Sequence, residues 1–138
     1  MLFRSAVAAV GRSLRRAFYS SSGSYIELAA PGGDDRDGGN SGLIVQMTLD
    51  PADSNPARVV RPRFDHWTPV GYQGTSMAAP HVAGAAALLF SQGITTPAAI
   101  EAALERSATD LGTRGRDNDF GFGLINPRAS LRGMGLAR

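Results

Sequence analysis

The most constraining feature of this 138-residue chain is an alanine-rich apolar segment, residues 77–90, which directly follows a Gly-Thr-Ser triplet. Alanine is the strongest helix former, and Pro80 falls in or near the first turn, where a missing N–H group costs least. These features predict a helix that begins close to Ser76. Because the segment is apolar on every side, we expect the helix to be buried all round.

Short apolar segments and turn residues divide the rest of the chain. Strands are predicted at residues 5–10, 25–29 and 43–49, with a weaker strand near 17–19. Helices are predicted to begin at Thr96-Pro97 and at Asn126-Pro127, because each pair joins an N-cap residue to a proline. Residues 34–42 and 50–63 are rich in Gly or Pro and predict irregular connections. No repeat or linker divides the chain, so the order of elements predicts part of one α/β domain.

A serine at the start of a buried helix has a chemical use. The unpaired N–H groups of the first turn create a positive field, which stabilises an oxyanion that forms beside the serine. The backbone N–H of Ser76 would be one donor to that oxyanion, and Gly74 allows backbone or substrate to approach closely. Serine is also a common helix N-cap, and a Gly-Thr-Ser triplet on its own is more often a cap than a nucleophile.

Composition excludes several kinds of site and partner. The chain has no cysteine, so it holds neither a disulfide framework nor a thiolate-bound zinc ion. Its 14 basic residues are all arginine and form no cluster with aromatic residues, so we expect no nucleic-acid partner. No apolar run reaches the roughly 18 residues that a transmembrane helix requires, so we expect no membrane span.

The segment Gly74–Gly84 reads G-T-S-M-A-A-P-H-V-A-G and resembles, in all eleven residues, the serine motif of the subtilisin family. Further landmarks are similar to that family and follow in the family's order. They are a strand at residues 6–10, an A-x-F-S-x-x-G-like segment at Ala17–Gly23, an A-P-G turn at Ala30–Gly32, and a closing G-x-G segment at Gly121–Asn126. The resemblance covers nearly the whole chain.

The resemblance implies a partial subtilisin-like fold of the α/β class, with three layers and a mostly parallel sheet flanked by helices. It assigns the role of nucleophile to Ser76. The residues that it assigns to the nucleophile loop are Gly74, Thr75 and Met77, and the structural residues of the motif are Pro80, His81 and Gly84.

In this family the acid and the base of the catalytic triad precede the serine in the chain. The acid lies in a D-T/S-G segment and the base in an H-G-T-x-V-A-G segment, and neither occurs in residues 1–138. We therefore expect residues 1–138 to be the C-terminal portion of a subtilase catalytic domain. An N-terminal half that carries the Asp and the His is then the expected partner.

Two histidines are candidates for a substitute base. His81 lies five residues after Ser76, a spacing that turns it away from the serine on a helix, so we expect a structural histidine. His66, preceded by Asp65, is the weaker candidate for a displaced pair that activates Ser76, because adjacent residues seldom orient each other as a triad requires.

An acidic loop follows the A-P-G turn, and it is the one candidate for a bound cation. Asp34, Asp35 and Asp37 offer the oxygen ligands that Ca²⁺ prefers. Arg36 interrupts the cluster and the EF-hand spacing is absent, so a solvated turn is the preferred interpretation. The resemblance implies no organic cofactor.

Residues 1–23 contain four arginines and no acidic residue, a composition that resembles an organellar presequence. A secretory signal fits less well, because the apolar run at residues 5–10 is short. We favour a family strand at residues 5–10, since the later landmarks follow it in family order. Relatives are mostly exported, which implies an extracytoplasmic location, but the chain shows no convincing signal peptide.

The resemblance implies a serine endopeptidase that cleaves polypeptide substrates through an acyl-enzyme formed on Ser76. The alternatives are an inactive remnant, a pseudoenzyme, or a binding module that kept the fold without the acid and the base. Without a base a serine hydroxyl is a weak nucleophile. We therefore expect this chain alone to have no useful peptidase activity.

Overall fold

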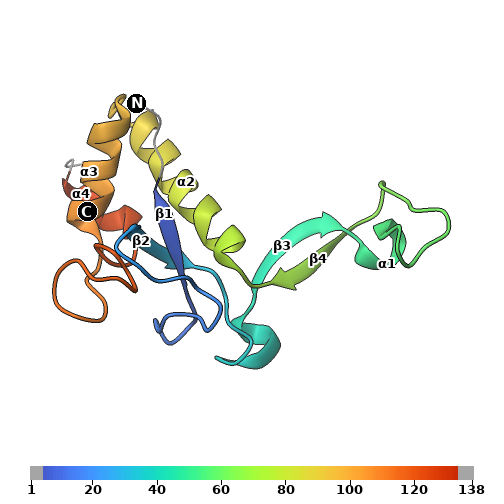
Figure 1. The fold of residues 1–138 in the computed structure, drawn as a ribbon. Helices are drawn as coiled ribbons and strands as arrows, with labels where there is room; N and C mark the ends of the chain where they lie inside the picture. Colours follow the sequence, from blue (N-terminus) through green and yellow to red (C-terminus); the bar gives the residue numbers. More distant parts are fainter. Residues whose placement is uncertain (1–4, 134–138) are drawn as a thin grey trace.

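The computed structural model describes residues 5–133, and Figure 1 shows how its strands and helices are arranged. The strands are β1 (Ala6–Val10), β2 (Ile26–Pro31), β3 (Ile44–Leu49) and β4 (Trp67–Tyr72). The helices are α1 (Pro51–Ser54), α2 (Thr75–Ser91), α3 (Pro97–Ser107), α4 (Pro127–Gly133) and the short 3₁₀ helix η1 (Gly39–Gly42). None of the helices within residues 5–133 is both long and apolar enough to cross a membrane.

The centre of the fold is a parallel pair of strands, β1 and β2. Ala8 lies opposite Ala29, and Ala9 lies opposite Ala30. All four alanines are fully buried, and their small side chains leave room for larger residues to pack over both faces of the pair. The pairing confirms the first two predicted strands, and its parallel direction is typical of an α/β fold.

One face of this pair is covered by α2, and α3 and α4 pack against α2 and against each other. The buried stripe of α2 consists of Ala78, Val82, Ala85 and Leu89, at helical spacing. The stripe joins Ala9, Leu28 and Ala30 of the strands and Ile100, Ala103 and Leu104 of α3 in one apolar core. Complete burial of a side chain such as Leu89 stabilises the fold by about 1.5–3 kcal/mol.

The opposite face of the pair is covered by the chain around Phe120. The ring of Phe120 belongs to a second apolar cluster, whose other buried members are Ala8, Val10, Ile26 and Ala29. Leu124 packs at the edge of this cluster and forms a parallel bridge with Ala29. The closing segment of the chain therefore extends the sheet by a single bridge.

The prediction that α2 is buried all round is wrong for the described part of the chain. The exposed residues of α2 between its two ends include Ala79, Pro80, Ala83, Gly84, Ala87, Leu88 and Phe90. Phe90 is 56% exposed, and a Cβ added to Gly84 would meet no atom within 4 Å. The helix is apolar on both sides, but only one side has a packing partner here.

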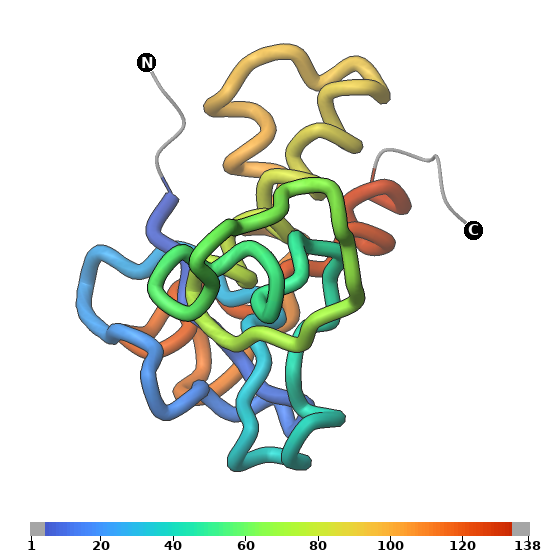
Figure 2. The backbone as a smooth tube through the Cα atoms, turned by 90° about the vertical axis from the view of Figure 1, so that its right-hand side faces the viewer, coloured from blue at the N-terminus to red at the C-terminus, as the bar shows by residue number. Residues whose placement is uncertain are grey.

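The strands β3 and β4 form an antiparallel hairpin that projects from the rest of the fold in Figure 1 and points toward the viewer in Figure 2. Sequence analysis predicted β3 but not β4 or α1. Pro69 lies within β4, opposite Met47, and a proline weakens the sequence signal of a strand. The strand forms because both strands of this two-stranded sheet are edges, where a residue without an N–H is tolerated.

The weaker strand predicted near residues 17–19 is wrong. Leu14 has a φ of 61°, which reverses the chain, and Arg16 makes only an isolated bridge with Val10. The backbone N–H of Ala17 donates to the carbonyl of Ala9 at 2.9 Å, so the chain folds back over β1 without forming a strand. Since β1 itself is a strand in the core, the structure favours the family strand over a targeting segment. Residues 1–4 lie outside the described residues.

Gly121 lies where two stretches of backbone meet. Its φ is 63°, and an added Cβ would collide with the backbone of Glu27. We predict that Gly121→Ala destabilises the fold by more than the roughly 1–2 kcal/mol that the left-handed conformation alone costs a residue with a Cβ. Urea unfolding of the two proteins measures this difference.

Gly115 provides the matched control. Its φ is 83°, but nothing lies within 4 Å of an added Cβ. Gly115→Ala should therefore cost only the conformational part. Equal losses in the two variants would contradict the steric explanation.

Candidate functional site

Ser76 is the second residue of α2, which begins at Thr75 and has Gly74 as its N-cap. The alternative interpretation of Ser76 as an N-cap is therefore wrong. Ser76 is exposed, and its hydroxyl has no hydrogen-bond partner among residues 5–133. The hydroxyl is presented to solvent at the start of the helix, where a substrate can reach it.

The start of α2 has the electrostatic character that an oxyanion requires. The carbonyl of Gly74 accepts hydrogen bonds from the N–H groups of Met77, at 2.9 Å, and Ala78, at 3.3 Å. The N–H groups of Thr75 and Ser76 have no acceptor within the helix, because they belong to its first turn. The dipole of this 17-residue helix adds a positive field at the same end. A negative oxygen beside Ser76 would therefore be stabilised.

The nucleophile loop is tied to the A-P-G turn. The N–H of Gly74 donates to the carbonyl of Gly32 at 2.9 Å. The Tyr19 hydroxyl lies 2.8 Å from the same carbonyl and 2.5 Å from that of Gly33, so it donates to this turn. Burial raises the pKa of Tyr19 above its ordinary value of 10.0; the Gly74 N–H opposes this shift and the charge of Asp34 adds to it. Tyr19 thus helps to hold the loop that carries Ser76.

His81 is exposed, and its Nδ1–H donates to the carbonyl of Met77 at 2.7 Å. A separation of five residues turns a side chain by about 140° around a helix. His81 therefore points away from Ser76, and its hydrogen bond agrees with the structural role that was expected.

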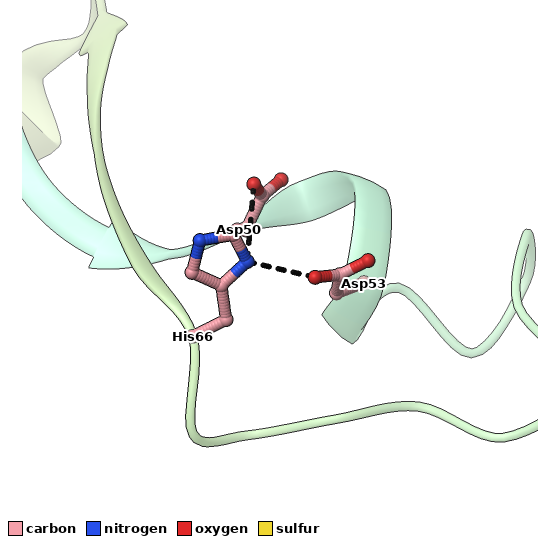
Figure 3. Close-up of side chains that lie close together, drawn as sticks. All are labelled: Asp50, Asp53 and His66. Carbon is pink, nitrogen blue, oxygen red and sulfur yellow. Dashed lines mark hydrogen bonds and ion pairs between the residues drawn. The ribbon is translucent and has the colours of Figure 1, made fainter.

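The alternative in which Asp65 pairs with His66, which the sequence disfavoured, does not form in the structure. The carboxylate of Asp65 accepts two hydrogen bonds from Arg63, each 3.1 Å long. Nδ1 of His66 instead lies 2.8 Å from Oδ2 of Asp53 and 3.6 Å from Oδ2 of Asp50, as Figure 3 shows. The hydrogen bond to Asp53 raises the pKa of His66 above 6.5.

His66 also lies far from the nucleophile. The six residues of β4 separate it from the loop before Ser76, which corresponds to about 20 Å of extended chain. Neither histidine of the chain is therefore placed to take a proton from Ser76. Among residues 5–133 the serine stands without a general base.

Sequence analysis missed the cluster of Asp50, Asp53 and His66. One signal was available in the sequence. Asp50 and Asp53 are three residues apart around a proline that begins a helical turn, and this spacing places both side chains on the same side of the turn. The position of His66 follows from the pairing of β3 with β4. Because β4 was not predicted, nothing indicated that His66 lies beside the aspartates.

A shallow groove runs between β3 and the first turns of α2. It is lined by Ile44, Val45 and Gln46 of the strand and by Met77, Pro80 and His81 of the helix. The groove lies between the edge of β3 and Met77, the residue that follows Ser76. An extended peptide is the kind of ligand that such an edge can bind.

Among the described residues, Asp34, Asp35 and Asp37 do not bring three ligand atoms together. Asp34 is buried and accepts two backbone N–H groups at 2.9 and 3.2 Å. Asp37 accepts the N–H of Ser13 at 2.6 Å, and this bond lowers the pKa of Asp37. The loop is a turn, as preferred, but it is held by a buried Asp34 rather than being fully solvated.

Removal of the Tyr19 hydroxyl tests the link between the A-P-G turn and the nucleophile loop. We predict that Tyr19→Phe lowers the free energy of unfolding by about 0.5–1.5 kcal/mol, the net value of a typical hydrogen bond. A phenolate cannot donate, and the pKa of Tyr19 is raised in the folded chain. The contribution is therefore fully present below pH 10 and is lost as the pH rises through the raised pKa.

Urea unfolding of the wild-type chain and the variant at a series of pH values measures this difference. Tyr25→Phe is the matched control, since the Tyr25 hydroxyl donates only to the nearby Ser22 carbonyl and the side chain is exposed. An equal loss in both variants, or a difference that grows above pH 10, would contradict the assigned role of Tyr19.

This chain is similar to known proteins over most of its length. The model of the subtilase family matches residues 5–123. Subtilisin E of Bacillus subtilis is 41% identical over 130 residues, which are 92% of this chain and 26% of subtilisin E. An extracellular protease of Xanthomonas campestris is 35% identical over 128 residues, which are 91% of this chain and 19% of that protein.

Solved structures show the same likeness. A protease from Pseudoalteromonas arctica superposes with a TM-score of 0.72 and 32% identity, covering 92% of this chain and 34% of that one. The chain thus spans about a quarter of the length of subtilisin E and about a third of the superposed protease. The partial α/β fold of the described residues is the subtilisin-like fold expected from the sequence. On the family match, the sequence identity and the structural likeness together, this chain belongs to the subtilase family.

Proposed function

We propose that this chain is the serine-bearing portion of a subtilase endopeptidase, in which Ser76 forms an acyl-enzyme with polypeptide substrates. The observation that carries the proposal is the exposed hydroxyl of Ser76 at the start of α2, beside N–H groups that have no acceptor in the helix. Membership of the subtilase family supports the class of reaction.

In the proposed reaction, Oγ of Ser76 attacks the carbonyl carbon of a peptide bond. The oxygen of the tetrahedral intermediate becomes negative and accepts a hydrogen bond from the Ser76 N–H. The intermediate collapses to an ester and releases an amine, and water then hydrolyses the ester. Gly74, Thr75 and Met77 hold the loop on which the hydroxyl is carried, and the groove between β3 and α2 is the surface that we assign to the substrate.

The proton of the Ser76 hydroxyl needs a base that the described residues do not provide. In subtilisin itself, loss of the catalytic serine or histidine alone lowers kcat by about 2 × 10⁶-fold. We carry this measured value over by family membership and propose that the base and its orienting acid come from outside these 138 residues. By itself the chain would then behave as an inactive member of the family, which is the second candidate function.

The open face of α2 supports an N-terminal portion of a subtilase domain as the partner. A glycine within a helix costs about 0.5–1 kcal/mol relative to alanine, yet Gly84 has no atom near its missing Cβ. The exposed residues around it are apolar, including Leu88 at 39% exposure. A segment that packs closely on this face explains both the glycine and the apolar surface.

We also propose an extracytoplasmic location. The Xanthomonas campestris relative bears the name of an extracellular protease and matches 91% of this chain. The proposal rests on this relative and on the family.

A fluorophosphonate probe tests whether Ser76 is activated within this chain. We predict no covalent adduct by mass spectrometry when the purified chain is treated alone, because no base lies beside the hydroxyl. Circular dichroism confirms that the sample is folded, and Ser76→Ala identifies any labelling elsewhere. An adduct on Ser76 that is absent from the variant would show that a residue of this chain acts as the base, against the proposal.

A further inference from the structure

Three side chains with metal-binding atoms converge at the end of the hairpin that is distant from Ser76. Asp50, Asp53 and His66 each offer one ligand atom, and these three atoms lie within 4.8 Å of one another. Figure 3 shows the imidazole of His66 facing both carboxylates. Asp53 belongs to α1, and Asp50 is the residue before that helix. The side chain of Asp50 is 22% exposed, that of Asp53 40% and that of His66 53%, so an ion from solvent can enter.

Backbone hydrogen bonds hold these donors in place. The N–H of Asp50 donates to the carbonyl of His66 at 2.9 Å and closes the base of the loop. Oδ1 of Asp50 accepts the N–H of Ala52 at 2.8 Å, which turns Oδ2 toward the imidazole. The N–H of Asp53 donates to the carbonyl of Asp50 at 3.1 Å, so the backbone of Asp53 is fixed relative to Asp50. The site is therefore held by short local contacts that do not depend on an ion.

The spacing of the donors suits a small tetrahedral ion. Bonds of about 2.0–2.2 Å from Zn²⁺ to nitrogen and oxygen place neighbouring ligand atoms roughly 3.3–3.6 Å apart. The distance from Nδ1 of His66 to Asp50 is 3.6 Å, at the upper limit of that range, and the distance to Asp53 is 2.8 Å, which is shorter than the range. A movement of about half an ångström by the exposed Asp53 side chain would admit the ion, and water would complete the tetrahedron.

The charge of the cluster also favours a cation. Arg63 interacts electrostatically with Asp53, but its guanidinium is engaged by both oxygens of Asp65. Within residues 5–133, the only ion-pair partner of Asp50 and Asp53 is His66. With a neutral imidazole, the two carboxylates carry a negative charge that Arg63, bound to Asp65, offsets only in part.

We propose that Asp50, Asp53 and His66 form a binding site for one divalent transition-metal ion, with Zn²⁺ as the best fit. An imidazole nitrogen suits Zn²⁺, whereas Ca²⁺ and Mg²⁺ favour oxygen ligands. The ion joins α1 to the start of β4 and so fastens the tip of the hairpin. The site lies at the other end of the hairpin from Ser76, so it stands or falls independently of the proposed peptidase activity.

Zinc titration of the full 138-residue chain by isothermal calorimetry tests the site. One ion per chain should bind, and Co²⁺ at the same site should give the intense visible absorption of a tetrahedral complex. Loss of a group that only supports a metal ligand weakens metal binding by roughly 10–100-fold. Asp53→Asn and His66→Ala each remove a ligand itself, so each should weaken zinc binding by more than that. Asp50→Asn keeps an oxygen to cap α1 but removes the carboxylate, and it should also weaken binding.

Asp35→Asn is the matched control, since it removes an exposed acid that does not belong to the cluster. Its zinc affinity should equal that of the wild-type chain. The proposal is overturned if the folded wild-type chain shows no saturable binding of Zn²⁺, or if Asp53→Asn and His66→Ala both bind as the wild type does. Equal affinity for Ca²⁺ and Zn²⁺ would also overturn it, because the imidazole would then play no part.

Discussion

The packing of α2 on the parallel strands β1 and β2 is the interaction on which the rest of the structure depends. Val82 and Leu89 of the helix are almost completely buried against alanines of the strands, and each contributes about 1.5–3 kcal/mol. The helix is thereby fixed over the A-P-G turn, where Gly74 bonds to Gly32. The position of Ser76 is a consequence of that packing, since it stands only two residues after Gly74.

The same helix shows that the described fold is one-sided. Its second face is apolar and open, and Gly84 at its middle has empty space where other residues carry a Cβ. A subtilase site needs an acid and a base besides the serine. The open face and the solitary serine are therefore two aspects of one proposal, in which a further portion of the domain packs on α2 and brings the base to Ser76.

Much of this arrangement was predicted from the sequence, because local signals and tertiary packing agree there. The eleven-residue motif predicted α2 and its serine, and the apolar runs predicted β1, β2 and β3. The strand β4 was missed because Pro69 weakens a strand signal and only pairing with β3 reveals it. The cluster around His66 was missed for the same reason, since cross-strand neighbours depend on register. The exposure of one side of α2 was not predicted, because a helix that is apolar on all sides gives no information about which segment packs against each side.

Reconstitution tests the central claim most directly. The chain is mixed with a separately produced polypeptide that carries the subtilase segments D-T/S-G and H-G-T-x-V-A-G, and fluorophosphonate labelling of Ser76 is followed by mass spectrometry. The account predicts labelling only in the mixture, and its loss in Gly84→Leu, a change that leaves the isolated helix intact but blocks close approach. A stable complex in which Ser76 stays unlabelled, or equal labelling of the Gly84→Leu variant, would contradict it.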